Sequence, residues 1–179
     1  AGAVNVLYGT PTGLPGSGSQ LFTQNTPSVG NSAEPFDWFG AALSGGDFDH
    51  DGFADLAVGV PGEIIGRSSG AAGAVNVLYG TAPGLTGSGS QYFTQDTPGV
   101  GSSVEGYDAF GSALTAGDFD HDSYADLAIG VPSESIGSIL GAGAVNVLYG
   151  TSTGLTGLGS QFFSQNSPGV WSTAEQFDH

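Results

Sequence analysis

The sequence contains no cysteine, no methionine and only one basic residue, Arg67, in a chain of 179 residues. The absence of cysteine excludes disulfide bonds and thiolate metal sites. Nucleic acids are bound through patches of Lys and Arg, so a single basic residue argues against them as partners. No apolar run approaches the roughly 20 residues of a membrane-spanning helix, and we expect no membrane span. Because an initiator methionine is missing, we expect a processed product or an excerpt of a longer protein.

Acidic residues dominate the charge, with 17 of them against the one basic residue and a net charge of −16. Eight of the 17 lie in two nine-residue windows, 47–55 and 118–126. A general acidic coat, as in salt-adapted proteins, would spread over every surface stretch. The concentration of carboxylates in two windows suggests a bound cation instead.

The chain is a tandem repeat of two elements. Element X begins with the string AGAVNVLYGT at residues 1, 72 and 142, a period of about 70 residues, and its first two copies extend over 1–27 and 72–98. Element Y is FGAALSGGDFDHDGFADLAVGV at 39–60, and it returns as FGSALTAGDFDHDSYADLAIGV at 110–131. The chain therefore reads X-Y-X-Y-X.

Each element predicts two short strands. In X, Ala3–Tyr8 alternates with a period of two residues, and a Gly/Pro/Thr-rich loop separates it from an aromatic strand around Gln20–Thr23. In Y, the apolar runs Phe39–Leu43 and Ala54–Val60 flank the acidic window. Four short strands per repeat, joined by Gly-rich turns, predict an all-β fold of four-stranded antiparallel β-propeller blades, incomplete or open in this chain. A β-sandwich with duplicated hairpins, or a β-solenoid, is the alternative.

This interpretation divides the chain into a half blade of outer strands at 1–38, a blade at 39–109, and a second blade with the start of the next repeat at 110–179. Two and a half blades cannot close a ring, and their open sheet edges invite pairing with other chains. We therefore expect further repeats in a longer array, or copies of the chain that continue head to tail as a filament.

Each acidic window places carboxylates at loop positions 1, 3, 5 and 9, where they would repel one another without a counter-ion. Calcium takes six to eight oxygen ligands and would also accept the main-chain carbonyl of position 7. We therefore expect two calcium sites. The candidate ligands are Asp47, Asp49, Asp51, Phe53 (carbonyl) and Asp55 in the first loop, and Asp118, Asp120, Asp122, Tyr124 (carbonyl) and Asp126 in the second.

Two other kinds of loop share part of this pattern. An EF-hand also needs a Glu at position 12 and flanking helices, but that position is Val58 or Ile129, inside an apolar run. Solvated acidic turns are common, yet four aspartates at this spacing are hard to reach twice by chance. At position 6, Gly52 is replaced by Ser123 in the second loop. If that position requires a positive φ, the second site binds calcium more weakly.

The residues that surround the loops resemble a known family. Phe39-Gly40 with Gly59-Val60-Pro61, and Phe110-Gly111 with Gly130-Val131-Pro132, look like the FG-GAP repeats of the integrin α-subunit propeller. The resemblance implies four-stranded blades in which Y forms the two inner strands and X the two outer ones. It also implies that the loop aspartates are calcium ligands. A propeller of that family has seven blades, so this chain would supply only part of one.

Together these features predict a non-catalytic, extracellular or cell-surface calcium-binding repeat protein with a structural role. The alternative is a cell-adhesion or glycan- or protein-binding module of integrin-like type, with a cell-surface protein or glycan as partner. Catalysis needs one asymmetric constellation, whereas the candidate acids Glu63 and Glu134 recur once per repeat. His50, His121 and His179 are interpreted as solvent-facing spacers.

Overall fold

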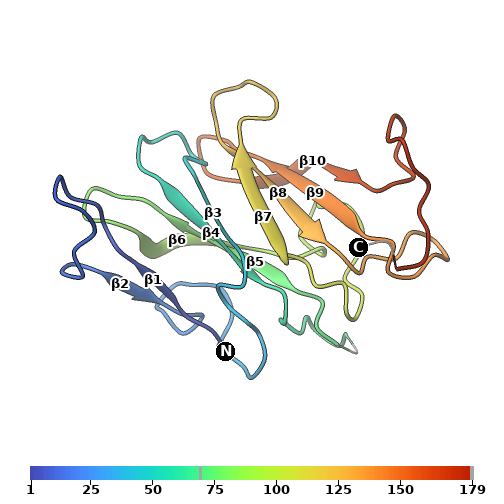
Figure 1. Ribbon diagram of the computed structural model, residues 1–179, viewed down its shortest axis with the longest axis horizontal. Coiled ribbons are helices and arrows are strands. Elements are labelled where there is room, and N and C mark those ends of the chain that lie inside the picture. Colours follow the sequence, from blue (N-terminus) through green and yellow to red (C-terminus); the bar gives the residue numbers. More distant parts are fainter. Residues whose placement is uncertain (69, 178–179) are drawn as a thin grey trace.

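The computed structural model describes residues 1–68 and 70–177, which form ten strands in three antiparallel sheets (Figure 1). The strands are β1 (Val4–Val6), β2 (Gln20–Phe22), β3 (Leu43–Gly46), β4 (Asp55–Val60), β5 (Ala74–Tyr79), β6 (Thr86–Phe93), β7 (Ala113–Gly117), β8 (Asp126–Val131), β9 (Ala144–Tyr149) and β10 (Thr156–Phe163). Within these residues, no helix is long and apolar enough to cross a bilayer.

Two of the sheets have four strands each, in the orders β3-β4-β5-β6 and β7-β8-β9-β10. We name them the first and the second blade, and the pair β1-β2 the half blade. Strands that follow one another in the sequence pair antiparallel with one another in both blades. Each blade takes its first two strands from Y and its last two from X. This confirms the expected all-β fold of incomplete propeller blades.

The strand expected at Phe39–Leu43 is wrong in position, because β3 begins at Leu43. Gly40 has a φ of 91°, a conformation that interrupts a regular strand. The turn keeps partial pairing with β4, since the Gly40 amide donates to the Gly59 carbonyl at 3.0 Å. The run is apolar because Phe39 is buried in the core (2% exposed), so burial rather than strand pairing explains its composition.

The same X sequence forms strands of different length in its three copies. It spans three residues in β1, but six residues in both β5 and β9. The strand β5 lies between β4 and β6, whereas β1 pairs with β2 in a sheet of two strands. The strands β5 and β9 are therefore longer because each also pairs with a strand of element Y, β4 or β8.

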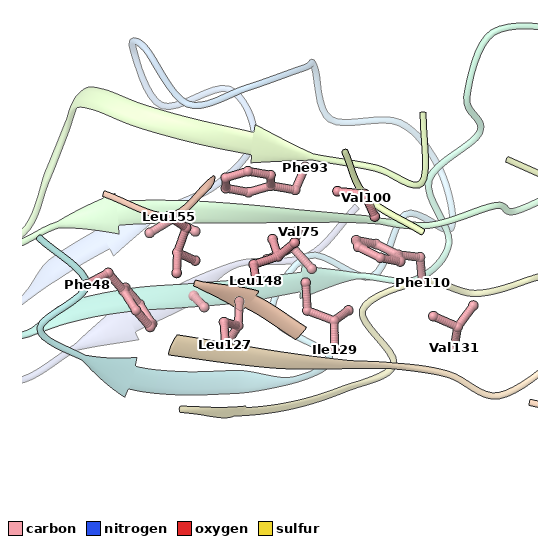
Figure 2. Packing of buried hydrophobic residues seen from close by; sticks show 12 residues of the cluster. Phe48, Val75, Phe93, Val100, Phe110, Leu127, Ile129, Val131, Leu148 and Leu155 are labelled. Carbon is pink, nitrogen blue, oxygen red and sulfur yellow. The ribbon is translucent and has the colours of Figure 1, made fainter. Parts of the chain in front are cut away.

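A hydrophobic core lies between the two blades (Figure 2). Val75 and Phe93 of the first blade pack with Leu127, Ile129 and Leu148 of the second. The alternate residues of the same strands face the half blade: Val58 and Leu78 belong to a second core. The strands β4 and β5 of the first blade are thus buried on both faces, which explains why they read as nearly continuous apolar runs.

The outer face of the second blade is not covered by another blade among the described residues. Three positions on that face are partly exposed, namely Val145, Phe163 and Val170 at 39, 40 and 44%. The equivalent residues of the first blade are covered by the second blade: Val75, Phe93 and Val100 are 0, 5 and 8% exposed. The uncovered positions line a hollow of about 430 Å³.

Each junction between blades also contains a buried carboxyl group. Glu63 follows β4 and is 1% exposed; it accepts hydrogen bonds from Gln24 Nε2 (2.7 Å) and from Asn31 Nδ2, both in the segment that follows the half blade. Glu134 occupies the same place at the next junction, where Gln95 and Ser102 are the donors. These repeated contacts support the structural interpretation of the two glutamates.

A second polar contact repeats across the junctions. The Tyr8 hydroxyl accepts the Leu85 amide at 2.7 Å, and Gln20 Nε2 donates to the Leu85 carbonyl at 3.0 Å. Tyr79 and Gln91 hold Leu155 in the same way. Tyr8 and Tyr79 are half-buried, and their hydroxyls join one sheet to the next.

Burial raises the pKa of Glu63 from its ordinary 4.5 to about 7, with a further contribution from the charge of Asp37. A raised folded pKa gives stability that is complete below about pH 4.5 and is lost as the pH rises through 7. We predict that Glu63→Gln removes part of this loss. Relative to wild type, the variant's free energy of unfolding should rise by about 1–2 kcal/mol between pH 5 and pH 8.

Urea unfolding in the presence of a chelator measures this difference without a contribution from metal. The exposed Glu34 provides the control, since Glu34→Gln makes the same chemical change near the same junction. A parallel pH profile for wild type and Glu63→Gln would contradict the prediction.

Candidate metal centre

Each acidic window connects the first two strands of a blade. The first loop runs from Gly46, the end of β3, to Asp55, the start of β4. The second runs from Gly117, the end of β7, to Asp126, the start of β8. In Figure 1 the two loops lie at the same edge of the molecule, at the top of the view. The loops are flanked by strands, so the strand–loop–strand interpretation is confirmed over the EF-hand.

Hydrogen bonds within the first loop fold it around its own carboxylates. Asp47 Oδ1 accepts the Asp51 amide at 3.0 Å, and Asp47 Oδ2 accepts the Gly52 amide at 3.0 Å. Asp51 Oδ1 accepts the Phe53 amide at 2.8 Å. The second loop repeats the pattern, with Asp118 accepting the amides of Asp122 and Ser123. These side-chain bonds turn the backbone tightly, as Asp does in turns.

The last aspartate of each loop anchors it to element X. Asp55 is 2% exposed; its Oδ2 accepts the Phe48 amide and its Oδ1 accepts the Gly80 amide, both at 2.7 Å. Asp126 bonds Phe119 and Gly150 in the same manner, at 2.7 and 2.9 Å. Burial raises the pKa of Asp55 to about 6, against the lowering effect of the two amides.

The glycines that meet these aspartates were not singled out by the sequence interpretation. A Cβ on Gly80 would lie 2.5 Å from the Ala54 carbonyl oxygen, and one on Gly150 would lie 2.5 Å from the Ala125 oxygen. Only glycine lets the amide come close enough to reach the aspartate. The recurring Tyr-Gly-Thr at the end of the first X strand was the available signal.

The structure brings most of the candidate ligands together. One carboxylate oxygen each of Asp47, Asp49 and Asp55 lies within 4.8 Å of the others, as do those of Asp118, Asp120 and Asp122. Asp51 and Asp126 lie outside these two clusters. The carbonyl role given to Phe53 and Tyr124 stays a prediction, as does the complete ligand set.

The clusters differ in their surroundings. Asp47 and Asp49 are half-buried, whereas Asp118, Asp120 and Asp122 are exposed. Burial and the charges of neighbouring aspartates raise the pKa of Asp49. Position 6 has a positive φ in both loops, 89° at Gly52 and 79° at Ser123. A Cβ at Gly52 would meet no atom within 4 Å, so the serine costs backbone strain rather than a clash.

The donor set fits a hard divalent cation. All side-chain donors are carboxylate oxygens, and calcium binds oxygen at 2.3–2.6 Å, so ligand oxygens around one ion lie within about 5 Å of one another. The clustered oxygens meet this condition. The aspartates also lack basic residues in the loop that could neutralise them, since Arg67 is the chain's one Lys or Arg.

Four-stranded sheets of this order, with an acidic loop between the first two strands of each, define the chain as a set of β-propeller blades with candidate metal loops. The FG-GAP repeat family model matches residues 39–78 and 110–148, one match in each blade. The chain therefore contains two FG-GAP repeats, one in each blade.

Curated relatives come from two kinds of protein. A phosphatidylinositol-glycan-specific phospholipase D of Rattus norvegicus is 35% identical over 121 residues, which is 67% of this chain and 14% of the relative. Integrin alpha-PS3 of Drosophila melanogaster is 39% identical over 97 residues, 53% of this chain and 8% of the integrin. Integrin alpha-3 of Mus musculus is 28% identical over 137 residues, 71% and 12% respectively. The chain thus spans a small part of each relative.

The double anchor at Asp55 leads to a prediction that does not depend on metal. Asp55→Asn keeps the shape but leaves one side-chain oxygen for two backbone amides, so a buried amide loses its partner. We predict a loss of about 2 kcal/mol in the free energy of unfolding. Urea denaturation in a chelator measures it. Asp51→Asn, which removes the same charge from an exposed turn, should lose much less. Equal losses for the two variants would contradict the anchoring role.

Proposed function

We propose that the chain is a calcium-binding structural module, with one ion on each blade. The observation that carries the proposal is the convergence of carboxylate oxygens in the hairpin loop of each FG-GAP repeat. The ligands are the aspartates and carbonyls at positions 1, 3, 5, 7 and 9: Asp47, Asp49, Asp51, Phe53 and Asp55, then Asp118, Asp120, Asp122, Tyr124 and Asp126. When bound, the ion supplies the positive charge that offsets repulsion among four carboxylates.

Side chains of the chain itself fold the loop around the position of the ion. Asp47 and Asp51 bend the loop through their amide contacts, and Asp55 ties the loop to the turn at Gly80. Each oxygen of Asp55 accepts one amide and keeps a second lone pair for a cation. Loop folding and metal binding therefore favour the same backbone conformation.

The module is part of a larger assembly of blades, on this proposal. The uncovered apolar face at Val145 and Phe163 supports it, because the equivalent face of the first blade is fully covered by its neighbour. Covering such a side chain contributes roughly 1.5–3 kcal/mol per residue. The covering blade belongs to further repeats or to another copy of the chain in a filament.

The proposed role is non-catalytic and extracellular or at the cell surface. The location is supported by similarity to integrin α chains. The phospholipase D relatives are enzymes by name, but the similarity covers 14% of the rat protein and falls mainly on repeat sequence. A cell-adhesion or glycan- or protein-binding module is the second candidate, favoured by the same integrin relatives.

Calorimetric titration with calcium tests the two sites. We predict two binding events, with the first loop tighter because Ser123 adopts a φ of 79°. Ser123→Gly should tighten the second site by about five- to thirtyfold, which corresponds to the 1–2 kcal/mol cost of a left-handed non-glycine residue. Asp49→Asn should remove the first event. Equal affinities at both loops would contradict the ranking, and absence of binding in millimolar calcium would overturn the proposed function.

Light scattering tests the assembly. We predict that the chain with calcium forms species larger than a monomer, since the exposed face can then be covered, and that a chelator reduces their size. Phe163→Ser, which makes the exposed face polar, should reduce association, whereas Leu14→Ser at the exposed N-terminal loop is the control. A monomer under all these conditions would contradict assembly between copies.

A further inference from the structure

The two acidic loops, about 70 residues apart in sequence, are in direct contact across the junction between blades. The Ala125 amide of the second loop donates to the Asp47 carbonyl of the first at 3.0 Å. The His50 ring of the first loop lies against the Tyr124 ring of the second, with centroids 5.4 Å apart and planes tilted by 60°. His50 thus lies between two aspartates in the sequence without joining the carboxylate cluster, and its ring contacts Tyr124 on the next blade.

The first loop also inserts a side chain into the core between blades. Phe48 is 0% exposed and packs in the cluster that contains Leu127 and Leu148 of the second blade. Figure 2 shows its ring at one end of this cluster. Phe48 lies directly between Asp47 and Asp49, two members of the carboxylate cluster. Any constraint on the direction of these two aspartates therefore also constrains the phenylalanine between them.

The equivalent residues at the open end of the chain show that the contact is directional. Phe119, which occupies the place of Phe48 in the second loop, is 47% exposed. Conversely, Phe53 and Ala54 on the receiving side of the first loop are exposed, whereas Tyr124 and Ala125 are partly covered by the first loop. Each loop thus has one side that reaches into the next blade and one side that receives the preceding loop.

We propose that the calcium sites of neighbouring blades are coupled through the contact surface formed by Asp47, Phe48 and His50 of one loop and Tyr124 and Ala125 of the next. This inference rests on the proposed calcium function and adds a dependence of each site on the other. An ion in the first loop holds the backbone from 47 to 50, which in turn holds the receiving side of the second loop in its binding conformation. The coupling is reciprocal, because it is a free energy shared by both sites.

Calorimetry with calcium as the probe measures the coupling. Asp120→Asn leaves the first loop as the one functional site, and Asp49→Asn leaves the second. The product of the two stepwise association constants of wild type, divided by the product of the two single-site constants, is the coupling factor. We expect a factor of about five or more, the lower range of measured couplings between sites.

A pair of matched variants tests the route. His50 and His121 both have a positive φ, 57° and 66°, which asparagine tolerates. His50→Asn removes the ring that contacts Tyr124 and should lower the coupling factor at least twofold. His121→Asn makes the same change where the loop has no following blade in this chain, and should leave the factor unchanged. Equal factors for the two variants would overturn the assigned route.

Amide hydrogen exchange supplies a readout that does not depend on affinity. In Asp120→Asn, which binds calcium at the first loop alone, calcium should slow exchange of the Ala125 amide on the second blade. A coupling factor of one with both sites binding, or an unchanged Ala125 exchange rate, would overturn the coupling and leave the calcium function standing. Absence of calcium binding to the wild-type chain would overturn the proposed function itself.

Discussion

The structure depends on the packing of apolar blade faces against neighbouring blades. In a blade, residues on both faces of the sheet, such as Val75 and Leu78, are apolar. Covering one face alone would leave the apolar side chains of the other face in water. The stability of a blade comes from neighbours before and after it, and roughly 1.5–3 kcal/mol per covered side chain is available at each junction. This constraint explains the nearly identical repeats, because every junction reuses one packing arrangement. It also explains why Val145 and Phe163 of the second blade are exposed while their equivalents in the first blade, Val75 and Phe93, are buried.

Polar groups at the junctions make the packing specific. Glu63 with Gln24, and Tyr8 with Leu85, join particular residues across the interface and would not tolerate a shifted register. The acidic loops add a third layer at the edge of the blades. Asp55 reaches from the loop to Gly80 within one blade, while Phe48 reaches from the same loop into the next. The candidate metal loop therefore has buried contacts with its own blade and with the next one, and it contributes to the packing between blades.

The fold and most of the candidate site were predictable because the signals are local. Repetition of X and Y defined the number of strands per blade. The alternating or continuous apolar runs placed the ends of β4 and β5 within one residue of their ends in the structure. Aspartates at alternate positions placed the cluster. The errors came from effects that lie outside the segment concerned. Phe39–Leu43 reads as a strand because Phe39 is buried, and β1 is short because its inner neighbour is absent from the sheet that contains it.

The amino-acid sequence by itself determined the period of the repeat, the all-β class, the family and the positions of the acidic loops, since each depends on residues within a few positions of one another. Only the tertiary structure decided which carboxylates converge: Asp55 but not Asp51 joins Asp47 and Asp49, whereas Asp122 but not Asp126 joins Asp118 and Asp120. It alone also decided that Phe48 and Phe119, equivalent in sequence, differ in exposure. The physical reason is that burial depends on the neighbouring blade, which the local sequence does not encode.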